Sequence, residues 1–174
     1  MDYVSPRELV ADLIEVARKK ADLGTADLLI RGALAGALLG IATSFAFVAV
    51  SQGLPPLVGA AIFPVGFVML VLLGLELATG NFAILPVGVL AGKVQTTELI
   101  RNWMLVYAGN LIGSLLYAML FYLSLTNSGH SDGGTLAELF RQAAQKKTIG
   151  FMALGTSALA LPSFAPCFAT GWSL

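Results

Sequence analysis

The stretch Leu75-Glu-Leu-Ala-Thr-Gly-Asn81 places a carboxylate, a hydroxyl and an amide inside an apolar run from Leu57 to Leu90. An ionisable group at membrane depth costs roughly 2.5–3.5 kcal/mol on insertion scales, so Glu76 is a candidate functional residue. The run spans 34 residues, whereas one membrane crossing needs only about 20. We therefore predict two half-helices with a break at or near Ala78–Asn81. Such a break is tolerated only where protein buries it or where it lines a wet cavity, which indicates a pore or a substrate pathway.

The composition is that of a membrane protein. Of 174 residues, 57% are hydrophobic and 11% are charged, against about 25% charged residues in a typical soluble domain. The formal net charge is zero, which argues against nucleic acid as a partner. A single cysteine and a single histidine exclude an internal disulfide framework and a multi-histidine metal site. The apolar runs are too long for barrel strands, so we predict an all-α membrane protein.

Residues 1–27 carry six acids and four bases and form a predicted cytoplasmic amphipathic helix. Ser5-Pro6-Arg7-Glu8 has the pattern of an N-cap, an N1 proline and a capping-box glutamate. Apolar residues then recur on one helical face: Leu9, Val10, Leu13, Ile14 and Ala17. Two interpretations stay open, namely a helix that lies on the membrane or on a neighbouring subunit, and an ordinary cytoplasmic cap.

Residues 28–174 form the predicted transmembrane domain. We place its crossings at about 31–50, 57–90 with a break near 76–81, 102–125, and 148–161 onward, the last of which is incomplete. In the first crossing, Gly32, Gly36 and Gly40 recur at every fourth position, which favours close approach of another helix. Basic residues number five up to Arg31, two in 93–101 and three in 126–147. The positive-inside rule therefore predicts a multi-pass protein of the cell (inner) membrane with a cytoplasmic N-terminus and the 126–147 loop outside.

Three segments form one recognisable pattern: Phe63-Pro-Val-Gly66, Gly74-Leu-Glu-Leu-Ala-Thr-Gly-Asn81, and Asn102-Trp-Met-Leu-Val-Tyr-Ala-Gly-Asn-Leu-Ile-Gly113. Together they resemble the formate/nitrite transporter family, and the resemblance covers about residues 5–161. It implies an aquaporin-like helical bundle of six membrane segments in two inverted halves. This chain then holds the first half, with a broken second helix, plus an incomplete fourth helix. The resemblance also implies a homo-pentamer with one pore per protomer, which passes formate, nitrite or a similar small anion and is linked to protons.

The same resemblance implies a pore pathway made of five residues. Phe63 and Leu77 would lie at apolar constrictions. Thr79 would supply the hydroxyl that meets the anion or orders pore water at the break. Ala78 and Asn81 would belong to the same pathway, although the family often has phenylalanine where this chain has Ala78. A narrow apolar constriction penalises a bare anion, and a half-helix N-terminus attracts one.

Other residues would support this pathway. Glu76, together with Gly80, would be structural and would tie the broken helix to its neighbours. A lysine in the outer loop before the fourth helix draws anions in, and Lys146 or Lys147 matches it in kind. A basic residue near the mouth raises the local anion concentration and can favour passage as the neutral acid.

The family continues into a second half, with a histidine on a broken fifth helix, whereas this chain ends at residue 174 and His130 stands elsewhere. The alternative function is therefore a truncated or frameshifted, non-conducting remnant of such a transporter. With a free choice of codons, a shifted frame over residues 161–173 can encode Cys-Asn-Trp-x-Val, which resembles the family's fourth helix. The gene sequence tests this hypothesis.

Two further classes have less support. A neutral-solute channel of the aquaglyceroporin type shares the half-helix design, but it needs Asn-Pro-Ala motifs that this sequence lacks. An enzyme needs a nucleophile–base pair, a metal cluster or a phosphate-binding loop, and the sequence has none of these patterns. We therefore expect no enzyme activity, no metal site and no cofactor.

Overall fold

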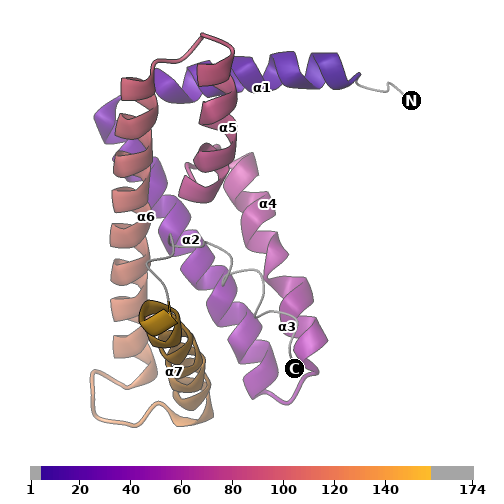
Figure 1. The fold of residues 1–174 in the computed structure, drawn as a ribbon. Helices are drawn as coiled ribbons and strands as arrows, with labels where there is room; N and C mark the ends of the chain where they lie inside the picture. Colours follow the sequence, from indigo (N-terminus) through magenta and orange to yellow (C-terminus); the bar gives the residue numbers. More distant parts are fainter. Residues whose placement is uncertain (1–4, 158–174) are drawn as a thin grey trace. The chain divides into compact units, whose positions relative to one another are not determined.

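The computed structural model describes residues 5–157, with side chains to Lys146, and this part of the chain folds into α-helices joined by turns (Figure 1). The helices are α1 (Pro6–Ala21), α2 (Thr25–Ser51), α3 (Pro56–Ile62), α4 (Pro64–Leu72), α5 (Ala78–Leu90), α6 (Thr96–Leu125) and α7 (Gly134–Ser157). The all-α prediction is confirmed. The predicted end of the fourth crossing, 158–161, and the tail 162–174 lie outside the described residues.

Helix α1 begins at the predicted capping box. The Ser5 hydroxyl accepts from the Glu8 backbone N–H at 3.3 Å, and the Glu8 carboxylate accepts from the Ser5 N–H at 2.8 Å. These bonds to the Ser5 backbone and then to its side chain hold the pKa of Glu8 below its ordinary value. Further along, Leu9 and Val10 are exposed, so both interpretations of this helix stay open.

Helices α2 and α6 are long and apolar enough to cross a membrane. Only 28% and 17% of their most apolar windows are buried inside the chain, whereas the core helix of a soluble protein is mostly covered. Helix α2 begins at Thr25, before the crossing predicted from about residue 31, and α6 begins at Thr96, before the crossing predicted from about residue 102. The extra turns of α6 include Arg101, which donates to the carbonyl oxygen of Leu23 and to the Thr25 hydroxyl.

The 57–90 run divides into half-helices, as predicted, but the break falls earlier. Helices α3 and α4 are separated only by Phe63, whose backbone is still right-handed helical. The non-helical segment that follows α4 is Leu73–Leu77, so Ala78–Asn81 form the first turn of α5 and not the break itself. A glycine at position 74 ends α4 before the polar residues are reached, as described below.

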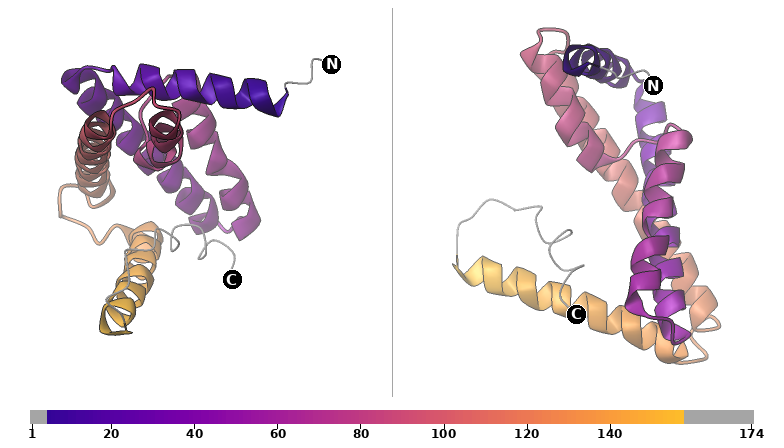
Figure 2. Two further views of the ribbon diagram at one scale, coloured as in Figure 1. Left: turned by 45° about the horizontal axis from the view of Figure 1, so that its top comes forward. Right: turned by 90° about the vertical axis from the view of Figure 1, so that its right-hand side faces the viewer.

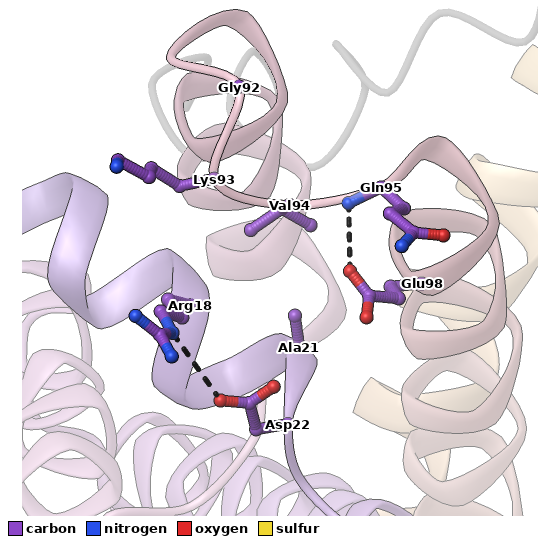
Figure 3. Close-up of a pocket in the computed structure, with 8 residues that line it drawn as sticks. All are labelled: Arg18, Ala21, Asp22, Gly92, Lys93, Val94, Gln95 and Glu98. Carbon is purple, nitrogen blue, oxygen red and sulfur yellow. Dashed lines mark hydrogen bonds and ion pairs between the residues drawn. The ribbon is translucent and has the colours of Figure 1, made fainter.

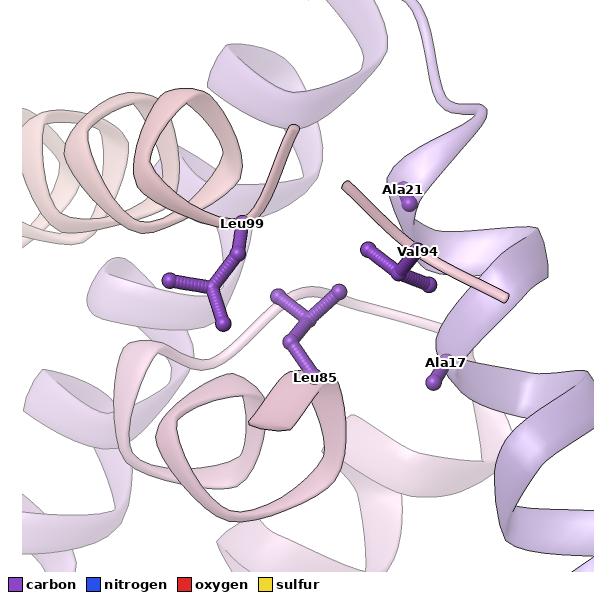
Figure 4. Close-up of a cluster of buried hydrophobic side chains, with 5 residues drawn as sticks. All are labelled: Ala17, Ala21, Leu85, Val94 and Leu99. Carbon is purple, nitrogen blue, oxygen red and sulfur yellow. The ribbon is translucent and has the colours of Figure 1, made fainter. Parts of the chain in front are cut away.

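The chain divides into two compact units, and the first consists of residues 1–42 and 65–120. In it, α1 runs crosswise to α5 and α6 and packs on α5 (Figures 1 and 2). One core cluster comprises Ala17, Ala21, Leu85, Val94 and Leu99 (Figure 4). A second comprises Leu28, Ala78 and Val106. These clusters bury the last turn of α1 and one side of α5.

A seam of small residues joins α2 to α6 inside this unit. A methyl group on Gly32 would stand 3.1 Å from the carbonyl oxygen of Val106 and 3.3 Å from the Cα atom of Gly109. Gly36 and Gly113 are more crowded still, against the backbone of Asn110 and Ala33, and Gly40 faces the ring of Tyr117. Most of the neighbouring atoms belong to the backbone and cannot swing aside, so the glycine ladder lies where the two helices touch.

Within the described residues, the second unit consists of 43–64 and 121–157. Its described core includes Phe140, whose ring centroid lies 4.5 Å from that of Phe47 and 5.4 Å from that of Phe121. Helix α7 is one continuous helix, Gly134–Ser157, and it begins inside the predicted 126–147 loop and continues past residue 148, where we predicted the fourth crossing to begin. The loop before it is accordingly only 126–133. Phe140 explains the early start of α7, because aromatic packing holds its first turns.

Candidate functional site at the break between α4 and α5

Helix α4 ends in a turn that the backbone completes by itself. Gly74 has a φ of +63°, in the left-handed region that favours glycine. Its N–H donates to the carbonyl oxygen of Val71, and the Leu75 N–H donates to that of Leu70. This is the Schellman arrangement, which satisfies the last carbonyl groups of a helix without any side chain.

Helix α5 begins with help from another helix. Leu77 is extended, with φ −110° and ψ 127°, and its side chain caps nothing. The Asn110 carboxamide of α6 caps the helix instead, because its Oδ1 accepts from the Ala78 N–H at 2.9 Å. Its Nδ2 donates to the carbonyl oxygens of Glu76 at 2.9 Å and Gly32 at 2.8 Å. One amide therefore ties the end of the break to the first residue of α5 and joins both to α2.

Glu76 is buried at the break, with 4% of its surface exposed. The Lys20 ammonium group of α1 donates to both carboxylate oxygens, each at 2.8 Å. The Asn81 amide adds a bond of 2.8 Å to Glu76 Oε2. A buried carboxylate without a partner would cost several kcal/mol, so the Lys20 contact is what permits an acid at this depth. The two charges together are formally neutral.

Asn81 is fully buried and carries the network on to α6. Its Nδ2 also donates to Asn102 Oδ1 at 2.8 Å, and Asn102 Nδ2 donates to the Lys20 carbonyl oxygen at 2.8 Å. The Trp103 indole N–H donates to the Asn81 carbonyl oxygen at 3.1 Å. The side-chain oxygen of Asn81 has no partner within the described part of the chain. Asn81 therefore belongs to the same buried hydrogen-bond network as Glu76 and does not reach the surface of the protein.

The first turn of α5 presents polar groups to the outside. In the described residues, the backbone N–H groups of Thr79 and Gly80 have no acceptor, because only Asn81 bonds back to Leu77. The Thr79 side chain is exposed, and a methyl group built on Gly80 would meet nothing within 4 Å. Leu77 is half-buried beside them. A hydroxyl and two unpaired N–H groups at the positive end of a helix dipole form a surface that suits an anion.

The other predicted site residues lie elsewhere. Ala78 is buried against Leu28 and Val106 and faces the protein interior. Phe63 is half-buried in the second unit, so the structure does not place it relative to the break. Lys146 is exposed on α7, in the same unit. Lys147 belongs to α7, but its side chain lies outside the described residues.

Three parts of this site do not follow from the sequence reasoning above. In the sequence, Lys20 is one of the basic residues in the last turn of α1, where a positive charge is favourable next to the helix dipole. The signal that could have identified it is Glu76, because a buried acid needs a cation as its partner. Asn102 and Trp103 belong to the family pattern without a role of their own. Gly74 is one glycine among many, but a glycine directly after an apolar helix is a helix-ending signal.

A separate hollow of about 330 Å³ lies between the end of α1 and the turn before α6. Its charged groups are largely engaged locally (Figure 3): Arg18 pairs with Asp22 at 3.9 Å, and Glu98 accepts from the Gln95 N–H at 2.8 Å. The remaining charge is the exposed Lys93. Within 5–146, no group of three or more histidine, cysteine or acidic residues is placed to hold a metal ion. The break is therefore the best candidate site.

Comparison with known proteins gives a family for this geometry. The family model described as formate/nitrite transporter matches residues 7–171. The chain is 34% identical to the uncharacterized transporter YrhG of Bacillus subtilis over 137 residues, which is 74% of this chain and 52% of that protein. It is 39% identical to the formate channel FocA of Haemophilus influenzae over 92 residues, 48% of this chain and 32% of that protein.

A third relative matches over about the same length as YrhG does. The formate channel BtFdhC of Bacillus thuringiensis is 29% identical over 142 residues, which is 78% of this chain and 52% of that protein. The chain thus spans about half the length, or less, of the curated relatives it matches. The region matched by the family model, residues 7–171, includes the complete break and nearly all of the helices that hold it.

Proposed function

Because this chain belongs to the formate/nitrite transporter family, we propose that it takes part in transmembrane transport of formate, nitrite or a similar small monovalent anion. Each protomer of a homo-pentamer would carry one pore, and passage would be linked to protons. Several relatives bear the name of a formate channel or a probable formate transporter, among them the formate channels of Haemophilus influenzae and Bacillus thuringiensis. The anion-facing surface in this chain would be the first turn of α5.

The observation that carries the proposal is the combination of groups at Thr79 and Gly80. Two backbone N–H groups without acceptors in the described residues, an exposed hydroxyl and open space stand together at a helix N-terminus. Each N–H can donate to an anion oxygen, and the helix dipole favours the negative charge. Donors of this kind recognise a small oxyanion without holding it as tightly as a fixed cation would.

The neighbouring acid does not oppose this role. Glu76 stands three residues before Thr79 in the sequence, and an unpaired carboxylate there would repel an anion. The two bonds of 2.8 Å from Lys20 cancel its charge. Glu76 and Asn81 therefore act as positioning residues that hold the break, and Thr79 and Leu77 act in the pathway.

The remaining roles follow the resemblance. Leu77 at the break and Phe63 between α3 and α4 would form apolar constrictions, where the neutral acid passes more easily than the anion. Lys146 or Lys147 would raise the anion concentration at the outer mouth. The N-terminus would be cytoplasmic in the cell (inner) membrane, and α1 would lie on that side.

A second candidate is a chain that folds and inserts without conducting. The observation in its favour is the same open space beside Thr79 and Gly80, because a pore needs protein on both sides of the pathway. The two candidates differ in flux and share every other property of the fold.

The test is formate flux into liposomes that contain the 174-residue chain, followed with labelled formate and with an internal pH dye. We expect flux above that of empty liposomes, a large loss in Thr79→Ala, and recovery in Thr79→Ser, which keeps the hydroxyl. Flux equal to that of empty liposomes, from protein shown to be inserted, would establish the non-conducting alternative. Equal flux in Thr79→Ala and wild type would remove Thr79 from the pathway.

A further inference from the structure

Arg31 is a charged residue that the proposed pathway does not yet use. It lies on α2, a helix with only one other charged residue, Asp27. The next cation in the chain after Arg31 is Lys93, and the only charged residue between them is Glu76. A cation on a membrane-capable helix is costly unless it is paired or has a function.

The side chain of Arg31 is directed toward the break. Its Nη1 donates to the carbonyl oxygen of Gly74 at 3.4 Å, in the segment that directly follows α4. The next residue on α2, Gly32, offers its carbonyl oxygen to Asn110, the residue that clamps the break. Arg31 therefore belongs to the same unit and the same neighbourhood as the first turn of α5.

Arg31 has no carboxylate partner in the part of the chain that the structure describes. Glu76 is already bonded to Lys20 through both oxygens. Asp27 stands at the i−4 position, where an acid commonly pairs with arginine, but none of the ion pairs within the described residues joins the two. A guanidinium group has five N–H donors, and a single long bond to Gly74 leaves most of them available.

We propose that Arg31 is an anion-attracting residue on the α2 side of the break, which takes the small monovalent anion before or after it meets Thr79. This inference rests on the proposed function and extends it. The ligand is an oxyanion the size of formate or nitrite, for which the guanidinium group of Arg31, a half-buried residue, supplies charge and paired donors. The half-buried position matters, because a fully exposed cation is screened by salt.

The test uses the 174-residue chain in zwitterionic detergent, with formate as the probe. Saturation-transfer NMR on the formate proton reports binding whether or not the chain conducts. We expect Arg31→Gln to raise the half-saturating formate concentration about fivefold, with Arg31→Lys closer to wild type because it keeps the charge. Lys93→Gln, which removes an exposed cation away from the break, is the matched control and should bind formate as wild type does.

The outcomes separate this inference from the proposed function. Arg31-dependent binding in a chain that shows no flux supports the inference and rejects transport by this chain. Flux that depends on Thr79, with unchanged formate binding in Arg31→Gln, rejects the inference and keeps the proposed function. An effect of Arg31→Gln that appears only when anionic lipid is added assigns Arg31 to a headgroup phosphate and also rejects the inference. Size-exclusion profiles of the variants check that each remains folded.

Discussion

Two regions of the first unit hold helices together by opposite means. The seam between α2 and α6 uses glycines, and its contacts are between backbones, such as Gly32 against Val106 and Gly109. The break between α4 and α5 uses side chains, with Lys20, Glu76 and Asn110 joined by bonds of 2.8–2.9 Å. The seam depends on the absence of side chains at its glycines, and the break depends on the hydrogen bonds and charges of its polar side chains.

The two regions therefore depend on different interactions: steric fit between helices at the seam, and paired polar and charged groups at the break. At the seam, any added atom meets backbone that cannot move, so packing alone decides whether the helices approach. At the break, each polar group needs its partner, and the loss of one leaves another buried without compensation. Substitutions in the two regions should therefore differ in how much they destabilise the protein and in whether a second substitution can restore its stability.

The largest effect is expected at the break, from Lys20→Met. This change leaves the buried Glu76 carboxylate without its cation, which should destabilise the protein by about 3 kcal/mol or more. Unfolding by detergent titration in micelles measures it. The double variant Lys20→Met with Glu76→Gln should regain much of the loss, and equal instability of the single and double variants would contradict this interpretation of the pair.

The seam comes next, with Gly113→Ala. The added methyl group would collide with the backbone of Ala33 and should cost about 2 kcal/mol as the helices move apart. Gly80→Ala is the matched control at the break, where the same methyl group meets nothing within 4 Å. In the same titration the control should unfold as wild type does, and the interpretation of the seam is wrong if both variants behave alike.

Asn110 belongs to both regions and should give a smaller effect. Asn110→Ala removes the acceptor for the Ala78 N–H and the donor to Glu76 and Gly32. We expect a loss of about 1 kcal/mol, comparable to the loss of a helix cap. Amide hydrogen exchange locates the loss: faster exchange should be confined to the first turn of α5, and uniform acceleration across α6 would indicate a packing defect instead.

The smallest effect is expected outside both regions, at the start of α1. The bonds from Ser5 lower the pKa of Glu8 below its ordinary value of 4.5. The contribution of this carboxylate is therefore complete above that value and is lost as the pH falls through the lowered pKa. NMR titration of the Glu8 side chain and the Ser5 amide should show this, and Glu8→Gln should remove the pH dependence at Ser5.

Much of this architecture could be predicted from the sequence, since local patterns determine it. The capping box at Ser5, the glycine ladder of α2 and the division of the 57–90 run all follow from spacing and residue type. The end of α4 has a local signal in Gly74, but the start of α5 could not be predicted, because it depends on where Asn110 can reach the backbone. The partner of Glu76 was equally hidden, since Lys20 lies 56 residues away in the sequence.

The site itself was predicted only in part. A list of residues near the break put Asn81 and Thr79 in one class, and the structure separates them, with Asn81 fully buried and Thr79 exposed. Two neighbours on a helix point in directions about 100° apart for each residue of separation, so proximity in sequence does not decide which of them meets the outside. Only the positions of α1 and α6 decide that.

The contacts of α1 with later parts of the chain have a consequence for the order in which the structure forms during synthesis. Lys20 leaves the ribosome early, but its carboxylate partner is made 56 residues later, and its backbone carbonyl waits 82 residues for Asn102. The break closes only after Asn110 has followed. During translation the Lys20 ammonium group therefore has no carboxylate partner until Glu76 is made, and the bond that ties the end of α1 to α6 forms only after Asn102 has been made.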